Sequence, residues 1–248
     1  MEKYKPDVLA LNETWLRADQ ENFAPKIPGY ILKHKARPTN SRGGGVGFFI
    51  QRDLRTHVKP HPASQLEQMW LEVILPNKRR LLVGTAYRPE SISVTDAIND
   101  LSQSVSFFSN FKHIFILTDF NIDFLNTTSK RATDFGTFLR HHDLIQLVTE
   151  PTRVTEQTAS LLDLIITDSS LMCKKMDVHH NPDLSDHAMI ICELVIEKKE
   201  CSSKYTTRQA LQKIYENDFC PIFAVSHGNK LGRQITSTVQ LKYLIIYF

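Results

Sequence analysis

Seven apolar runs of strand length recur along the first 196 residues, and turn residues separate them. Several of these runs are apolar at every position, which is typical of strands covered on both faces by another layer. Two stretches between them instead repeat apolar residues at helical spacing. We therefore expect an α/β fold, a layered sandwich of sheets and helices. The expected strands are residues 7–11, 45–50, 70–75, 80–87, 113–118, 161–167 and 188–196, and the expected helices are 93–111 and 130–144.

The pattern degrades after about residue 197, which sets the expected domain boundary. Residues 1–197 are predicted to form one domain, and a hydrophobic content of 42% over the chain suffices for a substantial core. Residues 198–220 are polar and lysine-rich, so a linker is expected there. Residues 221–248 show no coherent periodicity and are predicted to be a tail without recognisable organisation.

Charge and cysteine content exclude several classes of protein. Thirty basic and 27 acidic residues give a formal charge of +3, which permits a polyanionic partner but is far from a histone-like charge. The four cysteines have neither metal-site spacing nor the density of a disulfide scaffold. No charged and apolar leader opens the chain, and no apolar run reaches the ~20 residues of a membrane helix. We expect an intracellular protein, nuclear or cytoplasmic, without a membrane partner.

Polar residues recur where the apolar runs stop. Sites are often assembled in this way, from strand-end residues on a rigid sheet. The residues concerned are Asn12 and Glu13 after the first run, Tyr87 and Arg88 after the fourth, Asp119 and Asn121 after the fifth, Asp163 inside the sixth, and Asp186 and His187 before the last.

Most of these residues, taken singly, also have a purely structural explanation. Asp163 is the exception, because its apolar neighbours predict burial and a buried charge is costly without a partner. The structural alternatives are a turn or helix N-cap for Asp119, a helix cap for Asn12 and Glu13, a packed aromatic ring for Tyr87, and a surface turn for Asp186 and His187.

Taken together, the residues suit phosphate-ester hydrolysis. A carboxylate such as Glu13 is the kind of ligand that Mg²⁺ prefers, and the ion would neutralise a phosphodiester. Asp119 would orient or deprotonate an attacking water, and Asn121 would donate to a non-bridging oxygen. His187, backed by Asp163, would stay protonated and stabilise the charge that develops on phosphorus.

The same motifs resemble the endonuclease/exonuclease/phosphatase superfamily. More narrowly, they are similar to the endonuclease domain of LINE-type (non-LTR) retrotransposon polyproteins. The resemblance covers residues 5 to 196, with the motifs in order. They read DVLALNETWL, PGY, RGGGVGFFI, YRPE, DFNID, PTR, SLLDLIIT and LSDHAMI.

This resemblance implies a four-layer α/β sandwich of two packed sheets flanked by helices, and a DNA endonuclease dependent on Mg²⁺, with Mn²⁺ as a substitute and no other cofactor. The nick would leave a 3′-hydroxyl that primes reverse transcription. By position in the motifs, the implied metal ligands are Glu13 and Asp186. The implied catalytic residues are Tyr87, which contacts the phosphate, Asp119, Asn121, and Asp163 paired with His187. The implied substrate contacts are Asn12 and Arg153.

Three departures from the family pattern suggest alternatives. An upstream strand that carries an asparagine is expected in the family, and Met1 begins too late to include it. Thr118 replaces the glycine of the family's GDFN motif, and no reverse transcriptase follows. One alternative is therefore an inactive, truncated remnant of such a domain. Another is a related phosphodiesterase that acts on RNA or inositol phosphates.

Overall fold

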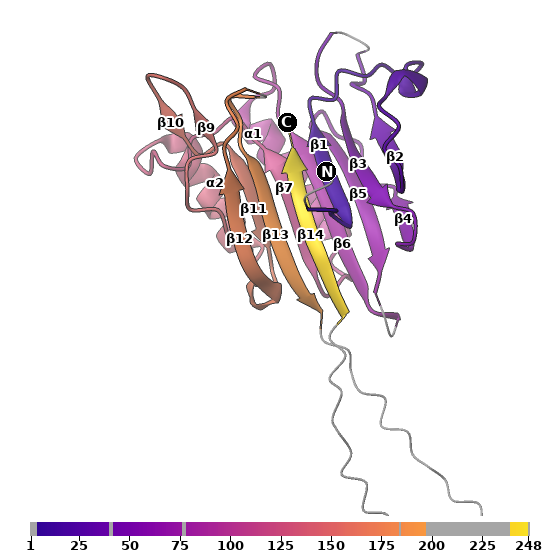
Figure 1. Ribbon diagram of the computed structural model, residues 1–248. Helices are drawn as coiled ribbons and strands as arrows, with labels where there is room; N and C mark the ends of the chain where they lie inside the picture. Colours follow the sequence, from indigo (N-terminus) through magenta and orange to yellow (C-terminus); the bar gives the residue numbers. More distant parts are fainter. Residues whose placement is uncertain (1–3, 40–41, 76–77, 184, 197–238, 248) are drawn as a thin grey trace, which may run out of the picture.

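The protein is described by a computed structural model that covers residues 4–39, 42–75, 78–183, 185–196 and 239–247. Two six-stranded sheets pack face to face, and a short two-stranded ribbon stands at one end (Figure 1). Strands β1 and β3 of the first sheet contact β6 of the second across the interface. The expected α/β sandwich of two packed mixed sheets flanked by helices is confirmed.

The first sheet has the strand order β12-β13-β14-β1-β3-β2. Its neighbours run antiparallel, except that β14 and β1 are parallel. The strands are β1 (Val8–Asn12), β2 (Tyr30–Lys35), β3 (Val46–Gln51), β12 (Cys173–His179), β13 (Met189–Ile196) and β14 (Val239–Tyr247).

The second sheet has the strand order β4-β5-β6-β7-β11-β8. Only β6 and β7 run parallel, and α1 makes the crossover between them. The strands are β4 (Thr56–Lys59), β5 (Glu67–Ile74), β6 (Arg80–Tyr87), β7 (Ile114–Asp119), β8 (Ile145–Gln146) and β11 (Asp163–Thr167). The ribbon consists of β9 (Arg153–Val154) and β10 (Ala159–Ser160).

Both described α-helices, α1 (Val94–Phe107) and α2 (Lys130–His141), lie behind the second sheet in Figure 1. The first begins at Ser93, whose side chain accepts a hydrogen bond from the backbone N–H of Asp96. Short 3₁₀ turns cover Glu21–Phe23 and Ser170–Met172. No helix in the described ranges is long and apolar enough to cross a membrane.

One main core fills the space between the sheets and under the helices. Trp70 of β5 is fully buried and packs against Phe108 at the end of α1, with ring centroids 5.1 Å apart. Gly84 of β6 makes room for this indole, because a Cβ there would lie 2.6 Å from the Trp70 ring. A second, smaller apolar cluster around Leu9 and Phe49 lies on the outer face of the first sheet.

All seven expected strands and both expected helices form, with ends that shift by at most four residues. Strands β2 and β12 were not predicted, because their sequences, YILKHK and CKKMDVH, carry too many polar residues for an apolar run. The largest difference concerns residues 239–247, expected to be a disorganised tail. They form β14 in the centre of the first sheet, since this run is apolar enough for a buried strand. The expected linker, 198–220, lies outside the described residues.

Candidate active site

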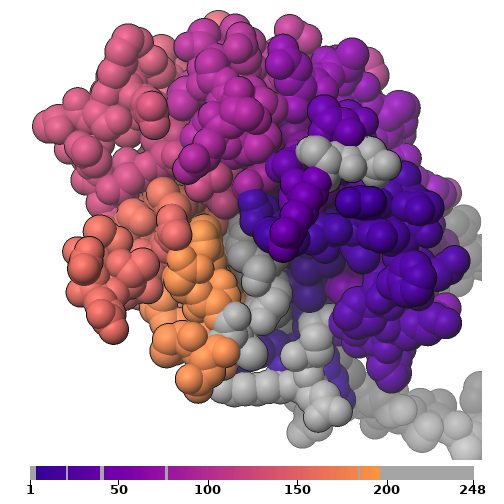
Figure 2. All heavy atoms as spheres, turned by 90° about the horizontal axis from the view of Figure 1, so that it is seen from above, coloured from indigo at the N-terminus to yellow at the C-terminus, as the bar shows by residue number. Residues whose placement is uncertain are grey.

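The site is built on a row of side chains across the second sheet. Strand register places Glu67 beside Tyr87, Tyr87 beside Asp119, and Asp119 beside Asp163. These positions lie at one end of β5, β6, β7 and β11, the upper end in Figure 1. Side chains in register on neighbouring strands lie on the same face of a sheet. Figure 2, which looks down on this end, shows early, middle and late parts of the chain meeting there.

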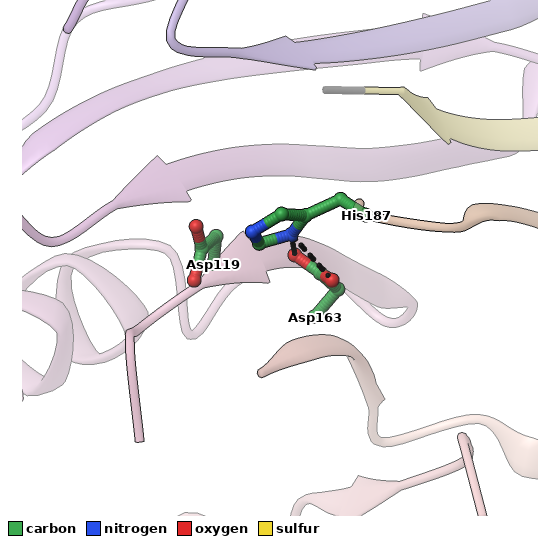
Figure 3. Close-up of side chains that lie close together, drawn as sticks. All are labelled: Asp119, Asp163 and His187. Carbon is green, nitrogen blue, oxygen red and sulfur yellow. Dashed lines mark hydrogen bonds and ion pairs between the residues drawn. The ribbon is translucent and has the colours of Figure 1, made fainter. Parts of the chain in front are cut away.

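His187 lies between two buried aspartates from neighbouring strands (Figure 3). Its Nδ1 is 3.0 Å from Oδ2 and 3.2 Å from Oδ1 of Asp163. The other ring nitrogen faces Asp119. The backbone also fixes this arrangement, because the Oγ1 of buried Thr152 accepts the N–H of Asp163 at 3.0 Å. The histidine is thus held by one carboxylate and directed at the other.

Burial and mutual repulsion shift the pKa values of this trio. Burial, with the nearby charge of Asp163, raises the pKa of Asp119 to about 7. Burial also raises the pKa of Asp163, although its bond to His187 opposes the change. Burial alone would lower the pKa of His187, but the hydrogen bond and charge of Asp163 outweigh it and raise that pKa. The trio therefore favours the protonated form of the imidazole, and Asp119 titrates near neutral pH.

Glu13 and Tyr87 meet across the two sheets. The Tyr87 hydroxyl donates a hydrogen bond to Oε1 of Glu13, which follows β1. Burial, followed by the hydrogen bond to this carboxylate, raises the pKa of Tyr87. The rest of the Glu13 side chain is exposed. A neutral phenol and an exposed carboxylate thus stand beside the buried trio.

Asn121 follows Asp119 in a tight turn with a left-handed backbone, φ 51°. Its N–H donates to Oδ1 of Asp119 at 2.9 Å, and its Nδ2 donates to the carbonyl of Arg88 at 3.1 Å. The Arg88 guanidinium is buried and bonds in turn to the carbonyls of Phe120 and Ile92. The turn after β7 is therefore fixed to the turn after β6.

Three other predicted site residues have partners outside the trio. Asn12 is only 2% exposed, and its Oδ1 accepts from Thr85 at 2.8 Å, while its Nδ2 has no partner in the described part of the chain. Asp186 forms an exposed ion pair with Arg153, with Nε and Oδ2 2.7 Å apart. Their predicted roles, substrate contact for Asn12 and Arg153 and metal binding for Asp186, stay predictions.

The donor set fits a hard divalent cation. One ligand atom from each of Asp119, Asp163 and His187 lies within 4.8 Å of the others. Two buried carboxylates that repel each other are the environment that a cation would relieve, and exposed Glu13 adds a further oxygen ligand nearby. The bond between Asp163 and His187 already occupies both oxygens of that carboxylate and Nδ1 of that ring. Glu13 and Asp119 are therefore the better candidates for the ion.

Sequence reasoning missed Thr152 and Glu67, and it selected Arg88 without a role. Thr152 and Arg88 act through hydrogen bonds to backbone groups distant in sequence, which no local pattern reveals. Glu67 precedes the apolar run that predicted the third strand, 70–75, whereas β5 begins at Glu67 itself. The only sequence feature that could have pointed to Glu67 was its position as a carboxylate next to a predicted buried strand.

Comparisons with known proteins identify a related family and a shared fold. A family model described as Endonuclease-reverse transcriptase matches residues 81–191, which include Tyr87, Asp119 and Asp163. No curated protein matches the chain significantly.

Several solved structures share the fold. The endonuclease domain of TRAS1, a telomere-specific non-LTR retrotransposon, superposes with a TM-score of 0.64 at 12% identity, over 79% of this chain and 90% of that one. The AP endonuclease LMAP from Leishmania major gives 0.63 at 13% identity, over 76% and 78%. The catalytic domain of Xenopus laevis APE2 gives 0.55 at 12%, over 75% and 82%.

Proposed function

Since residues 81–191 match the Endonuclease-reverse transcriptase family and the chain has the endonuclease/exonuclease/phosphatase fold, we propose that this protein is a metal-dependent DNA endonuclease. It would nick one strand of duplex DNA and leave a 3′-hydroxyl end. The observation that carries the proposal is the trio of Asp119, Asp163 and His187, in which His187 is bonded to one buried carboxylate and faces the other.

The residues have distinct roles in the proposed reaction. Asp119 orients the attacking water, and its burial beside the charge of Asp163 favours uptake of that water's proton. His187, kept protonated by Asp163, donates hydrogen bonds to the charge that develops on the phosphoryl oxygens. The water oxygen bonds to phosphorus, the P–O3′ bond breaks with its electron pair on O3′, and O3′ takes a proton from solvent water, which leaves a 5′-phosphate and a 3′-hydroxyl. Because the pKa of Tyr87 is raised, its hydroxyl stays neutral, and it would donate to a phosphate oxygen only if its hydrogen bond to Glu13 opened.

The cation supplies positive charge beside the phosphate when it is bound. Glu13 and Asp119 would hold it, and Mg²⁺ is the proposed ion, with Mn²⁺ as a substitute. Asp186 would take part only if its ion pair with Arg153 opened. Asn121 keeps one amide hydrogen on the carbonyl of Arg88, so its second amide hydrogen is the one that would reach a phosphate oxygen.

A plasmid assay tests the proposal. We expect the protein to convert supercoiled plasmid to the open circle with Mg²⁺ and to stop when EDTA is added. Glu13→Ala and Asp119→Ala should lower the rate by at least ~10²-fold, in keeping with the loss of a charged catalytic group. Asp53→Ala is the control, since Asp53 is exposed beyond β3, at the end of the sheet away from the site.

The chemistry of the nicked DNA ends and the range of substrates distinguish the alternative functions. The nicks should prime a DNA polymerase directly, which requires a 3′-hydroxyl. RNA and inositol phosphates should react more slowly than DNA. Nicking that persists in both alanine variants would refute the assigned site, and a folded protein without any hydrolysis would favour the inactive remnant.

A further inference from the structure

The backbone around Glu13 has an unfavourable conformation, which contacts with another loop must stabilise. Glu13 and Trp15 both have left-handed φ angles, 51° and 57°. This conformation is unfavourable for residues that have a Cβ, so the surrounding structure must impose it. Two hydrogen bonds do so: the N–H of Thr14 donates to the carbonyl of Gly45 at 3.1 Å, and that of Trp15 to the carbonyl of Gly44 at 2.8 Å.

The glycine loop that accepts these bonds is itself tightly packed. Gly43, Gly44 and Gly45 all have positive φ, between 68° and 87°. A Cβ on Gly44 would meet the Arg37 side chain at 2.4 Å, and one on Gly45 would meet Oγ1 of Thr14 at 2.5 Å. The RGGG sequence thus lets this loop lie directly against the loop of Glu13.

Glu67 holds the glycine loop from the second sheet. Its side chain is buried, with 5% of the residue exposed. Oε2 accepts the N–H of Gly45 at 2.5 Å, and Oε1 accepts Nε of Arg37 at 2.6 Å. Arg37 also donates from Nη1 to the carbonyl of Arg42 at 3.1 Å, so both halves of this pair bind the same loop.

Glu67 also belongs to the row that carries the proposed chemistry. It lies in register with Tyr87, the residue whose hydroxyl bonds to Glu13. Two routes therefore connect β5 and β6 to Glu13: one through Tyr87 directly, and one through Glu67 and the glycine loop. The first ends on the Glu13 carboxylate, and the second on the backbone of the two residues that follow it.

We propose that Glu67 and Arg37 are positioning residues, which hold the Glu13 carboxylate at the place where the divalent cation binds. This inference rests on the proposed metal-dependent function. Neither residue touches the cation; they act through Gly45 and the backbone of Thr14 and Trp15. Residues that orient a metal's ligands without binding the metal themselves typically change the metal's affinity by ~10–100-fold when they are lost.

Trp15 provides a direct readout of cation binding. Its indole Nε1 lies 3.4 Å from Oε2 of Glu13 and its side chain is half-exposed, whereas the chain's other tryptophan, Trp70, is buried. Mn²⁺ quenches nearby indole fluorescence, so a Mn²⁺ titration followed by tryptophan emission reports the site without any DNA. The Trp15→Phe variant gives the Trp70 background to subtract.

Glu72 offers a matched control on the same strand. It is also buried and ion-paired, to Lys59 and Arg80, but these contacts lie away from Glu13. Glu67→Gln should weaken Mn²⁺ binding at least ~10-fold, while Glu72→Gln should change it less than ~2-fold. Arg37→Lys should also weaken Mn²⁺ binding. It is a milder change, in a side chain that is 19% exposed.

Metal rescue separates positioning from loss of fold. In the plasmid assay, raised Mg²⁺ should restore most of the rate of Glu67→Gln but none of that of Glu13→Ala. Equal loss of Mn²⁺ affinity in Glu67→Gln and Glu72→Gln, or wild-type affinity in folded Glu67→Gln and Arg37→Lys, would overturn the proposal. A wild-type chain that binds Mn²⁺ with an affinity that falls in Glu67→Gln, yet never nicks DNA, would reject the nuclease and retain the positioning role. A wild-type chain that does not bind Mn²⁺ would reject both.

Discussion

Thr118 stands where the family resemblance predicts glycine, and the structure accommodates it as an ordinary strand residue. It is fully buried, and its backbone pairs with Ala86 on one side and Leu164 on the other. A β-branched residue suits such a position. The cost lies in its hydroxyl, because Oγ1 has no hydrogen-bond partner in the described part of the chain.

Thr118→Val is therefore expected to stabilise the fold. Valine keeps the shape and removes a buried, unpaired hydroxyl, which should raise the free energy of unfolding by ~1 kcal/mol. Urea unfolding followed by circular dichroism measures the change, and Thr85→Val is the contrast. The Thr85 hydroxyl donates to Asn12, so its loss should destabilise. A destabilised Thr118→Val would mean that the hydroxyl is satisfied after all.

At the residue scale, the sequence revealed the side chains that end or interrupt apolar runs. Asp119, Asp163 and His187 were selected in this way, and the structure brings them together. Partners that depend on register could not be selected. Glu67 lies opposite Tyr87 only because β5 and β6 pair in one particular register. The ion pair of Asp186 with Arg153 likewise depends on β9 approaching the residues before β13.

Among the elements, β14 is the one on which the first sheet depends most. It pairs with β1 on one side and β13 on the other, in the middle of the sheet. Without it, both neighbours would become edge strands with unpaired backbone groups. The strand that leads to Glu13 and the strand that follows His187 would both lose their shared neighbour.

Leu244→Pro tests this dependence. Proline removes a backbone donor at a residue that is in register with Val8 and Cys192 on either side. In a central strand this should cost ~3 kcal/mol or more and abolish a cooperative thermal transition in a marginal domain. Leu244→Val preserves the backbone and should melt close to the wild type. An unchanged melting temperature for the proline variant would show that β14 does not hold the sheet together.

At the element scale, prediction succeeded where a strand is apolar on both faces. Strands β5 to β7 lie between the first sheet and the helices, so their apolar runs were long and unambiguous. Strand β2 alternates between half-buried and exposed positions and carries lysines, so it resembled a loop. The sequence of β14 is mostly apolar, but nothing local indicates that residues so distant in the chain pair with β1.

For the whole molecule, the buried carboxylates make stability depend on pH. The folded-state pKa of Asp119 is about 7, and its ordinary value is 3.8. The folded protein thus binds this proton more tightly than the unfolded chain does, and the resulting stability is lost as pH rises from about 4 towards 7. The raised pKa of His187 acts in the same direction. A bound cation should offset the repulsion between ionised Asp119 and Asp163.

Melting experiments should therefore show linked effects of pH and metal. In EDTA, the wild type should melt at a lower temperature at pH 8 than at pH 5.5, and Mg²⁺ should raise the melting temperature more at pH 8. Asp119→Asn should be inactive. Its melting temperature should change less with pH than that of the wild type, and its free energy of unfolding at pH 8 should be higher by on the order of 1–3 kcal/mol. The same pH slope in wild type and Asp119→Asn would contradict this account.

The pairing of β1 with β14 also means that β1 is synthesised long before its partner strand. Val8 is in register with Leu244, which lies 244 minus 8, or 236, residues further along the chain. At a synthesis rate of ~5–20 residues per second, β1 waits ~10–50 s for this neighbour. During that interval the backbone that carries Glu13 lacks one of its two flanking strands. A nascent chain would therefore reach the ribosome's exit with the proposed metal site unfinished, and the proposed hydrolysis would have to wait for residues 239–247.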